Sequence, residues 1–377
     1  MYNILIEEFC DTYNLGEVVE KWLFPKGMNN QTFFVATTKG KYVIKALNPK
    51  RVATVKKREA IMIGEHIAKV ANEAGINSIF AKLINGEIMI EFKNQYYMVF
   101  DFCEGEILPL EEMTLEICSK MGELLAKLHQ TDFEQKHELQ MEIPKYSYGR
   151  KHTEAIDWQC YYNQISKKKK PKWFDQFETI IPQLNKMFAR THPIVLKFES
   201  NDYVISHSDF SHANTLWINT EPYLIDWETA GYIDATYNCF YTAIRFAIEN
   251  QSAGKRVINP EKVKAFLAGY ASKRRIDVKQ LKKVFDLIIY KRLNMLNVAL
   301  KTYSKSNEAI TKRQVTRRIK FSLSILKSYQ DFERHLPELK TYIITQQPDL
   351  HNGKYYFTFF SEKVKVKIAS IKRGDVK

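Results

Sequence analysis

Four polar residues in the second half of the chain have types and spacing suited to chemistry. An apolar run that ends at Ser206 leads into His207, Asp209 and Asn214, which form the pattern H-x-D-x-x-x-x-N. A second apolar run ends in Asp226. A carboxylate can orient a hydroxyl group and accept its proton, and carboxylate and amide oxygens are ligands that Mg²⁺ prefers. This set is suited to phosphoryl transfer, in which the protein mainly positions groups and neutralises charge.

Each residue of this pattern has an expected role. Asp209 is expected to be the catalytic base for an acceptor hydroxyl, and Asn214 and Asp226 are expected to bind Mg²⁺. A strand–turn–strand hairpin between the two ligands would fold both onto one edge. His207 is expected to brace the loop by packing and hydrogen bonding. Asp and Asn are also common turn residues, so the flanking apolar strands are what favour the catalytic interpretation.

Residues nearer the N-terminus support a nucleotide site. Lys45 ends the apolar segment Tyr-Val-Ile-Lys, and Glu59 follows on a predicted helix, where it could pair with the lysine. A segment with a single glycine, Gly27 to Phe33, includes Asn30 and could turn backbone N–H groups toward phosphates. Each feature alone is compatible with an ordinary surface position. Their order before the H-x-D segment favours a nucleotide-binding function.

The elements that would position these residues fall into two parts. The first part combines two predicted helices with strands and hairpins: helix 4–13, strands 18–24, 32–37 and 42–47, helix 52–71, and the hairpin 87–92 with 96–102. Apolar spacing over 114–129 then predicts an amphipathic helix, and the remainder is mainly helical apart from a strand-rich region at 203–226. The sequence predicts an α+β fold with two lobes. Residues 1–103 form a small N-lobe with an antiparallel sheet and a helix, and residues 104–377 a larger, mainly helical C-lobe.

Composition narrows the class of protein. The 377 residues carry a formal net charge of +14 and 5 cysteines, none in a C-x-x-C pair. This cysteine usage fits a reducing cytoplasm and argues against a zinc site or a disulfide framework. We expect no membrane-spanning helix and no signal peptide. The sequence does not define an oligomeric state.

With these residues assembled, the chain resembles the aminoglycoside phosphotransferase and choline kinase superfamily of small-molecule kinases. The resemblance covers about residues 20–245 and includes the single-glycine loop, the lysine and glutamate, the catalytic loop and the metal aspartate. It implies ATP and Mg²⁺ as cofactors. It also implies a hinge at 100–103, with backbone groups near Asp101 and Cys103 binding adenine. Two positions depart from the family pattern: Ser208 replaces the commoner Gly or Asn, and Asn238 replaces an aspartate that braces the catalytic loop.

The resemblance implies a small hydroxylated molecule as the phosphate acceptor. A net charge of +14 argues against a polycationic aminoglycoside, because such ligands favour acidic clefts. Asp157, Trp158 and Glu228 could contact a cationic amine, and a neutral or anionic metabolite is equally open. One alternative is a kinase-fold protein with a structural role, as in spore-coat proteins that share this fold. A nucleic-acid binder, suggested by the basic segment 311–318, is disfavoured because no recognition motif accompanies the charge.

Overall fold

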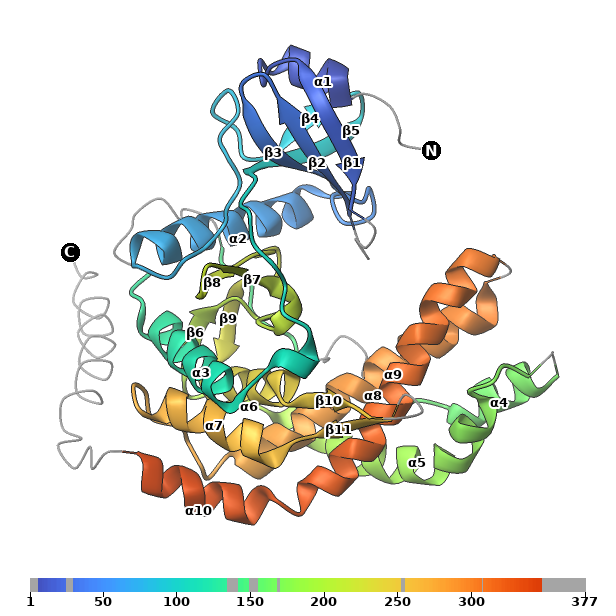
Figure 1. Cartoon of the computed structure of the whole chain (residues 1–377). Helices are drawn as coiled ribbons and strands as arrows, with labels where there is room; N and C mark the ends of the chain where they lie inside the picture. Colours follow the sequence, from blue (N-terminus) through green and yellow to red (C-terminus); the bar gives the residue numbers. More distant parts are fainter. Residues whose placement is uncertain are drawn as a thin grey trace, which may run out of the picture.

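The structure of the chain is a computed structural model with two lobes, one above the other in Figure 1. Gly27, the glycine of the predicted phosphate loop, lies outside the part of the chain that the structure describes. That part consists of residues 6–24, 30–133, 142–148, 155–167, 170–251, 255–306 and 308–347.

The N-lobe is built on an antiparallel sheet of five strands in the order β1-β2-β3-β5-β4. Helix α1 (Ile6–Thr12) packs Phe9 and Cys10 against Val35 and Ile44 of the sheet. The strands match the predicted segments closely: β1 (Val18–Leu23), β2 (Gln31–Thr37), β3 (Gly40–Ala46), β4 (Ile90–Phe92) and β5 (Gln95–Asp101). Both predicted hairpins are therefore confirmed.

Helix α2 (Val55–Glu73) lies between the sheet and the C-lobe (Figure 1). It begins at the N-cap Thr54, whose side chain accepts a hydrogen bond from the backbone N–H of Lys57. Ile61 packs into the hydrophobic cluster of the N-lobe. Ile63 and Ile67 instead belong to the large core of the C-lobe. The helix thus fixes the N-lobe on the C-lobe through apolar contacts on both sides.

The C-lobe is mainly helical, as predicted. Its helices are α3 (Leu115–Gln130), α4 (Trp158–Ser166), α5 (Phe174–Lys197), α6 (Ala235–Phe246), α7 (Pro260–Ala271), α8 (Leu281–Lys305), α9 (Ala309–Glu333) and α10 (Leu336–Gln346), with short 3-10 turns at η1 (Leu110–Glu112) and η2 (His212–Asn214). Helices α3 and α7 cross closely because each has a glycine at the contact. A Cβ on Gly122 would lie 2.0 Å from the Phe266 carbonyl oxygen, and one on Gly269 would lie 2.1 Å from that of Ser119.

Short antiparallel strand pairs flank the H-x-D-x-x-x-x-N segment of the C-lobe. Strand β7 (Thr215–Ile218) pairs with β8 (Glu221–Leu224), which is the hairpin predicted between Asn214 and Asp226. Strand β6 (Tyr203–Ser206) pairs with β9 (Gly231–Asp234). The sequence analysis did not predict β9, nor the three-residue strands β10 (Ile248–Asn250) and β11 (Arg256–Ile258), because such short strands show little periodicity.

Two segments outside this hairpin are hydrogen-bonded to it. The backbones of Glu106, which follows β5, and Trp217 exchange two hydrogen bonds of 3.0 and 2.7 Å. On the other strand, the Ile79 N–H, from the segment between α2 and β4, donates to the Leu224 carbonyl at 2.9 Å. The hairpin is therefore held on both of its strands. The position of the lobe boundary near residue 103 stays a prediction.

No helix in the described ranges is long and apolar enough to cross a membrane.

Candidate active site

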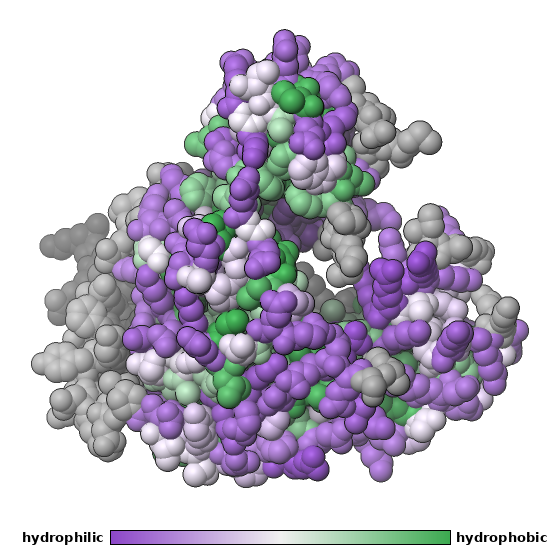
Figure 2. Space-filling model, in the orientation of Figure 1, coloured by the Kyte–Doolittle hydropathy of each residue, from purple (hydrophilic) through white to green (hydrophobic). Residues whose placement is uncertain are grey.

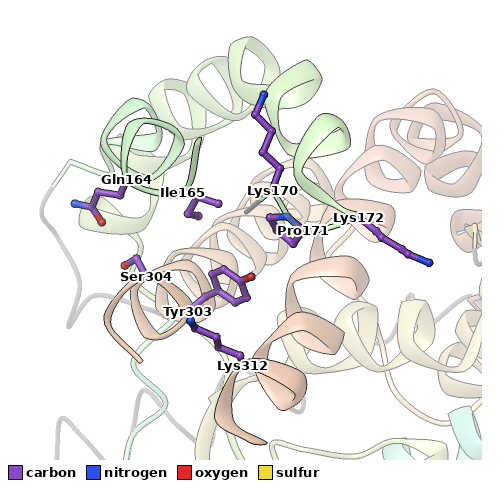
Figure 3. A pocket seen from close by; sticks show the side chains of 8 residues that line it. All are labelled: Gln164, Ile165, Lys170, Pro171, Lys172, Tyr303, Ser304 and Lys312. Atoms are coloured by element: carbon purple, nitrogen blue, oxygen red, sulfur yellow. The ribbon is translucent and has the colours of Figure 1, made fainter. Parts of the chain in front are cut away.

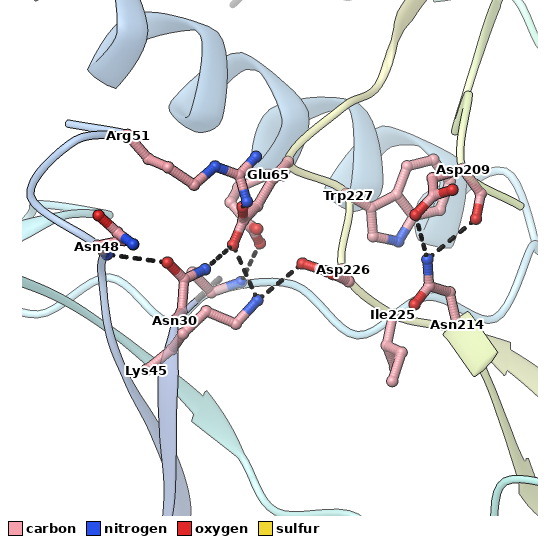
Figure 4. Close-up of polar contacts among 12 residues, drawn as sticks. Asn30, Lys45, Asn48, Arg51, Glu65, Asp209, Asn214, Ile225, Asp226 and Trp227 are labelled. Carbon is pink, nitrogen blue, oxygen red and sulfur yellow. Dashed lines mark hydrogen bonds and ion pairs between the residues drawn. The ribbon is translucent and has the colours of Figure 1, made fainter. Parts of the chain in front are cut away.

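Lys45 occupies the cleft between the lobes, where Figure 4 shows it pointing toward Asp226. Its Nζ lies 2.9 Å from Asp226 Oδ1 and 3.2 Å from Glu228 Oε1. The lysine side chain is 13% exposed. Burial by itself lowers the pKa of Lys45, but the carboxylates of Asp226, Glu228 and Glu65 outweigh burial and raise it. The lysine is therefore a fixed positive charge at the base of the cleft.

The glutamate that α2 brings to Lys45 is Glu65, which corrects the sequence-based pairing with Glu59. Glu65 is buried, and its Oε2 accepts a 2.8 Å hydrogen bond from the Ala81 N–H. Burial raises the pKa of Glu65 to about 7, against the opposing effect of Lys45. Each residue of an α-helix rotates the side-chain direction by about 100°. Six residues therefore leave Glu59 and Glu65 pointing roughly 120° apart around the helix. The sequence contained a sign of this burial, because Glu65 falls among the apolar positions of α2 that face the core.

Glu228 is a site residue whose role the sequence analysis missed. Its Oε1 accepts a 2.6 Å hydrogen bond from Asn30 Nδ2 in addition to the contact with Lys45, and Arg51 forms an ion pair with its other oxygen. Asn30 Oδ1 in turn accepts a 2.9 Å hydrogen bond from the Asn48 N–H. Asn30 thus ties the N-lobe loops to the C-lobe segment that follows Asp226. The contact between Glu228 and a cationic amine, considered from sequence, is not available because two cations already engage this carboxylate.

The loop 207–214 and the segment that leads to Asp226 are cross-linked by hydrogen bonds. His207 is fully buried, and its Nε2 donates to the Ile225 carbonyl at 2.8 Å. Burial lowers the pKa of His207, which keeps the ring neutral. The Ile225 N–H donates to the Asn214 carbonyl at 3.1 Å. These bonds hold the residues before Asp226 against the loop that carries Asp209.

Two residues of this region have left-handed backbone conformations. Ser208 has φ 59° and Asp226 has φ 65°. Residues other than glycine adopt this region at a cost of about 1–3 kcal/mol, and such residues cluster at functional sites. The conformation at position 208 accounts for the Gly or Asn that is commoner there in the superfamily. The side chains of Asp209 and Asp226, which lie at or next to these positions, are 45% and 44% exposed.

Asp209 lies between Asn214 and a cation that the sequence analysis did not identify. Asn214 Nδ2 donates to Asp209 Oδ2 at 3.0 Å, as Figure 4 shows. Arg245 of α6 donates from Nη1 to Asp209 Oδ1 at 2.6 Å. Burial raises the pKa of Asp209, but Arg245, His207 and Lys291 together outweigh burial and lower it. Asp209 is therefore ionised at neutral pH, and its side chain is 45% exposed to the cleft.

Asn238 braces the loop through neutral hydrogen bonds where an aspartate was expected from the resemblance. Its Oδ1 accepts hydrogen bonds from Ser206 Oγ at 2.7 Å and from His129 Nε2 at 2.9 Å. His129 Nδ1 accepts from the Tyr270 hydroxyl at 2.7 Å. Burial lowers the pKa of His129 to about 3. A neutral histidine paired with a neutral amide avoids a buried charge. Asparagine in place of the family's aspartate at position 238 therefore still accepts the hydrogen bond from Ser206.

The oxygens in the cleft fit a magnesium ion held together with nucleotide phosphates. The Asn214 amide nitrogen is used by Asp209, which leaves its Oδ1 for a cation, and the Asp226 side chain is 44% exposed. The described residues contain no cluster of three or more His, Cys, Asp or Glu side chains that could hold a metal alone. Mg²⁺ commonly uses only one or two carboxylates together with substrate phosphates and water. The donor set therefore suits Mg²⁺ rather than zinc.

The predicted hinge offers backbone groups rather than side chains. The Asp101 carboxylate is paired with Lys82 at 2.7 Å and points into solvent, with its side chain 63% exposed. Within the described chain the Cys103 N–H has no hydrogen-bond partner, so this donor is available to a ligand. The remaining predicted residue of the nucleotide site, Gly27, lies outside the described residues.

A separate pocket lies away from these residues, at the junction of the α4–α5 connection with α8 and α9. It has a volume of about 450 Å³, and Figure 3 shows Lys170, Lys172 and Lys312 around it. Part of the lysine-rich segment 167–172 therefore lines a pocket, and Lys170 also lies 5.0 Å from the Phe174 ring centroid. None of the predicted site residues borders this pocket.

Comparison with solved structures defines the class to which this arrangement belongs. A spectinomycin phosphotransferase in complex with ADP and spectinomycin matches with a TM-score of 0.62 at 14% identity, over 87% of this chain and 99% of that one. A choline kinase from Cryptosporidium parvum Iowa II matches with a TM-score of 0.53 at 14% identity, over 90% and 99% of the two chains. The fold is therefore that of the bilobal, protein-kinase-like small-molecule kinases.

Residues 23–275 match the phosphotransferase enzyme family, and the chain belongs to that family. This match confirms the resemblance seen in the sequence. A homoserine kinase from Bradyrhizobium sp. (strain ORS 278) is 28% identical over 125 residues, which are 33% of this chain and 36% of the relative. The chain thus spans about a third of the length of the curated relative that it matches. Family and fold together support a small-molecule phosphotransferase.

Proposed function

We propose that the protein transfers the γ-phosphoryl group of ATP to a hydroxyl group of a small molecule. The observation that carries this proposal is the convergence of four groups on one cleft. Lys45 lies 2.9 Å from Asp226, and Asn214 lies 3.0 Å from Asp209. These are the charge-neutralising and hydroxyl-orienting groups that phosphoryl transfer requires. Figure 2 shows the surface hollowed between the N-lobe and the tip of the α8–α9 hairpin.

Each residue has a distinct task in this proposal. Asp209 orients the acceptor hydroxyl and takes its proton as the phosphoryl group is transferred. Lys45 holds nucleotide phosphates, and the Cys103 N–H contributes to adenine binding. Asn214 and Asp226 hold Mg²⁺, which when bound neutralises charge on the phosphate oxygens. His207, through its bond to the Ile225 carbonyl, keeps the metal-ligand segment in register with the catalytic loop.

The roles of Asp209 and the nucleotide residues can be tested separately. Asp209→Asn keeps the size of the side chain but removes the proton acceptor. We expect acceptor-dependent ADP release to fall by about 10²–10⁴-fold, while the thermal stabilisation by ATP and Mg²⁺ is retained. Asp202→Asn is a matched control, because Asp202 is also paired with an arginine, Arg274, and its side chain is 44% exposed. This control should transfer phosphate at the wild-type rate.

Two outcomes would contradict the proposal. Substantial turnover by Asp209→Asn would show that another group serves as the base. Absence of any stabilisation of the wild-type protein by ATP and Mg²⁺ would instead favour the structural role considered as the alternative.

A further inference from the structure

A lysine beside the proposed catalytic base is held between two aromatic rings. Lys291 of α8 is half-buried, with its Nζ 4.0 Å from the ring centroid of Tyr241 and 5.0 Å from that of Tyr146. Among the described residues no carboxylate forms an ion pair with Lys291. Cation–π contacts offset part of the loss of hydration. They do not neutralise the charge.

Arg245 adds a second positive charge at the same place. Its guanidinium carbon lies 5.5 Å from the Tyr241 ring centroid, so Tyr241 is shared by both cations. Burial raises the pKa of Tyr241, but Lys291 and Arg245 outweigh burial and lower it to about 8. A buried phenol with a lowered pKa reports a strongly positive local potential.

The same cations act on Asp209. Arg245 donates to Asp209 Oδ1 at 2.6 Å. Burial raises the pKa of the Asp209 carboxyl, and Arg245, His207 and Lys291 lower it. One carboxylate therefore faces two cations. A single carboxylate balances only one of these two positive charges, and an excess half-buried charge is unfavourable unless a ligand supplies a second anion.

We propose that Lys291 and Arg245 bind an anionic group, a carboxylate or a phosphate, on the hydroxylated acceptor. This inference rests on the proposed function, because it places the acceptor beside Asp209. A cationic acceptor would meet like charges at this position, which are unfavourable. The positive charge of Lys291 and Arg245 has the same sign as the net charge of the chain, which is +14.

The residues that the sequence offered for a cationic amine do not oppose this assignment. The Asp157 carboxylate caps α4 by accepting a 2.8 Å hydrogen bond from the Cys160 N–H. Trp158 is buried in the core. Glu228 is occupied by Lys45 and Arg51.

Two series of compounds with matched carbon skeletons test the charge of the acceptor. The three-carbon series is glycerate, glycerol 3-phosphate, glycerol and 3-aminopropane-1,2-diol. The six-carbon series is gluconate, glucose 6-phosphate, glucose and glucosamine. Binding is measured by calorimetry on the full chain with a non-hydrolysable ATP analogue and Mg²⁺, which prevent anions from binding at the nucleotide site. We expect an anionic member to bind at least about tenfold more tightly than its neutral and amino counterparts. The carboxylate and phosphate members show which anion is preferred.

Variants on α8 assign that binding to Lys291. Lys291→Met should weaken anion binding by at least about tenfold, and Lys291→Arg should restore it. Lys283→Met is the matched control, because Lys283 also lies over an aromatic ring, 4.9 Å from the Phe198 centroid. Retained binding of the ATP analogue by Lys291→Met verifies that the variant is folded.

Three results would overturn the proposal: no anionic member binds, a neutral or amino member binds as tightly, or Lys291→Met leaves anion binding unchanged. These results are distinct from failure of the proposed function. Asp209→Asn should still bind the anionic compound while losing transfer, so persistent transfer in that variant would contradict the base and leave the binding result intact.

Discussion

Lys45 of strand β3 and Asp226 of the C-lobe form an ion pair across the cleft, with 2.9 Å between Nζ and Oδ1. The two residues are 181 positions apart in the chain. Burial raises the pKa of Asp226, but Lys45 outweighs burial and lowers it. The lysine thus keeps the proposed metal ligand ionised and links the two lobes.

Lys45→Met should lower the rate of phosphoryl transfer strongly and change the free energy of unfolding little. The variant loses the group that holds phosphates and the charge that faces Asp226, so we expect kcat/KM to fall by about 10²-fold or more. Steady-state ADP release checks this. Lys41→Met on the same strand is the control, because Lys41 lies on the surface and pairs with the exposed Glu104 at 3.0 Å. Equal activity of the two variants would refute the role of Lys45.

Gly64→Ala should displace the segment that carries Asp226. A Cβ at this position on α2 would lie 2.3 Å from the Trp227 carbonyl oxygen. Either α2 or the segment that contains Trp227 must shift, and overpacking of this kind costs about 1–3 kcal/mol of stability. Urea denaturation measures the loss, and ATP binding should weaken with it. Gly40→Ala is the comparison, because the nearest atom to a Cβ there is the Tyr42 hydroxyl oxygen at 3.2 Å, which is the end of a side chain rather than backbone. A fully stable and active Gly64→Ala variant would contradict the close packing.

Position 208 should tolerate glycine but not a β-branched residue. Ser208 has φ 59°, a region that glycine adopts freely and valine does not. Ser208→Gly should change stability by no more than about 1 kcal/mol, whereas Ser208→Val should lose about 2 kcal/mol or more. Chemical denaturation of both variants measures this. Similar stabilities for the two would contradict the left-handed conformation at this position.

The neutral pair of His129 and Asn238 predicts a specific pH dependence. The pKa of His129 is lowered to about 3 in the folded protein, from 6.5. The unfolded chain therefore binds the extra proton below pH 6.5. The stability from this histidine is present above 6.5 and is lost as the pH falls toward 3. Between pH 6.5 and 5 the loss should be about 2 kcal/mol. Denaturation at both pH values provides the measurement.

Asn238→Asp is the informative variant for this prediction. An aspartate would give His129 an anionic partner and raise its pKa, so the loss of stability on acidification should become smaller. An unchanged loss would show that His129 does not account for the pH dependence.

The sequence by itself determined the order and identity of most elements of this protein. The strands around Lys45, the amphipathic helix near residue 120 and the hairpin between Asn214 and Asp226 follow from apolar periodicity and turn residues, which act over a few positions. The H-x-D-x-x-x-x-N pattern is likewise local. These features were sufficient to predict the two-lobed fold and the family. They also brought the principal candidate residues into one proposed site.

Only the tertiary structure decided which side chains meet between distant segments. Glu65 rather than Glu59 faces Lys45, because the orientation of α2 depends on its packing against the C-lobe through Gly64 and Ile67. Arg245 reaches Asp209 from α6, 36 positions away, and Lys291 comes from another helix. Contacts of this kind depend on how helices pack rather than on local sequence. For that reason the electrostatic character of the acceptor site could be inferred only from the folded chain.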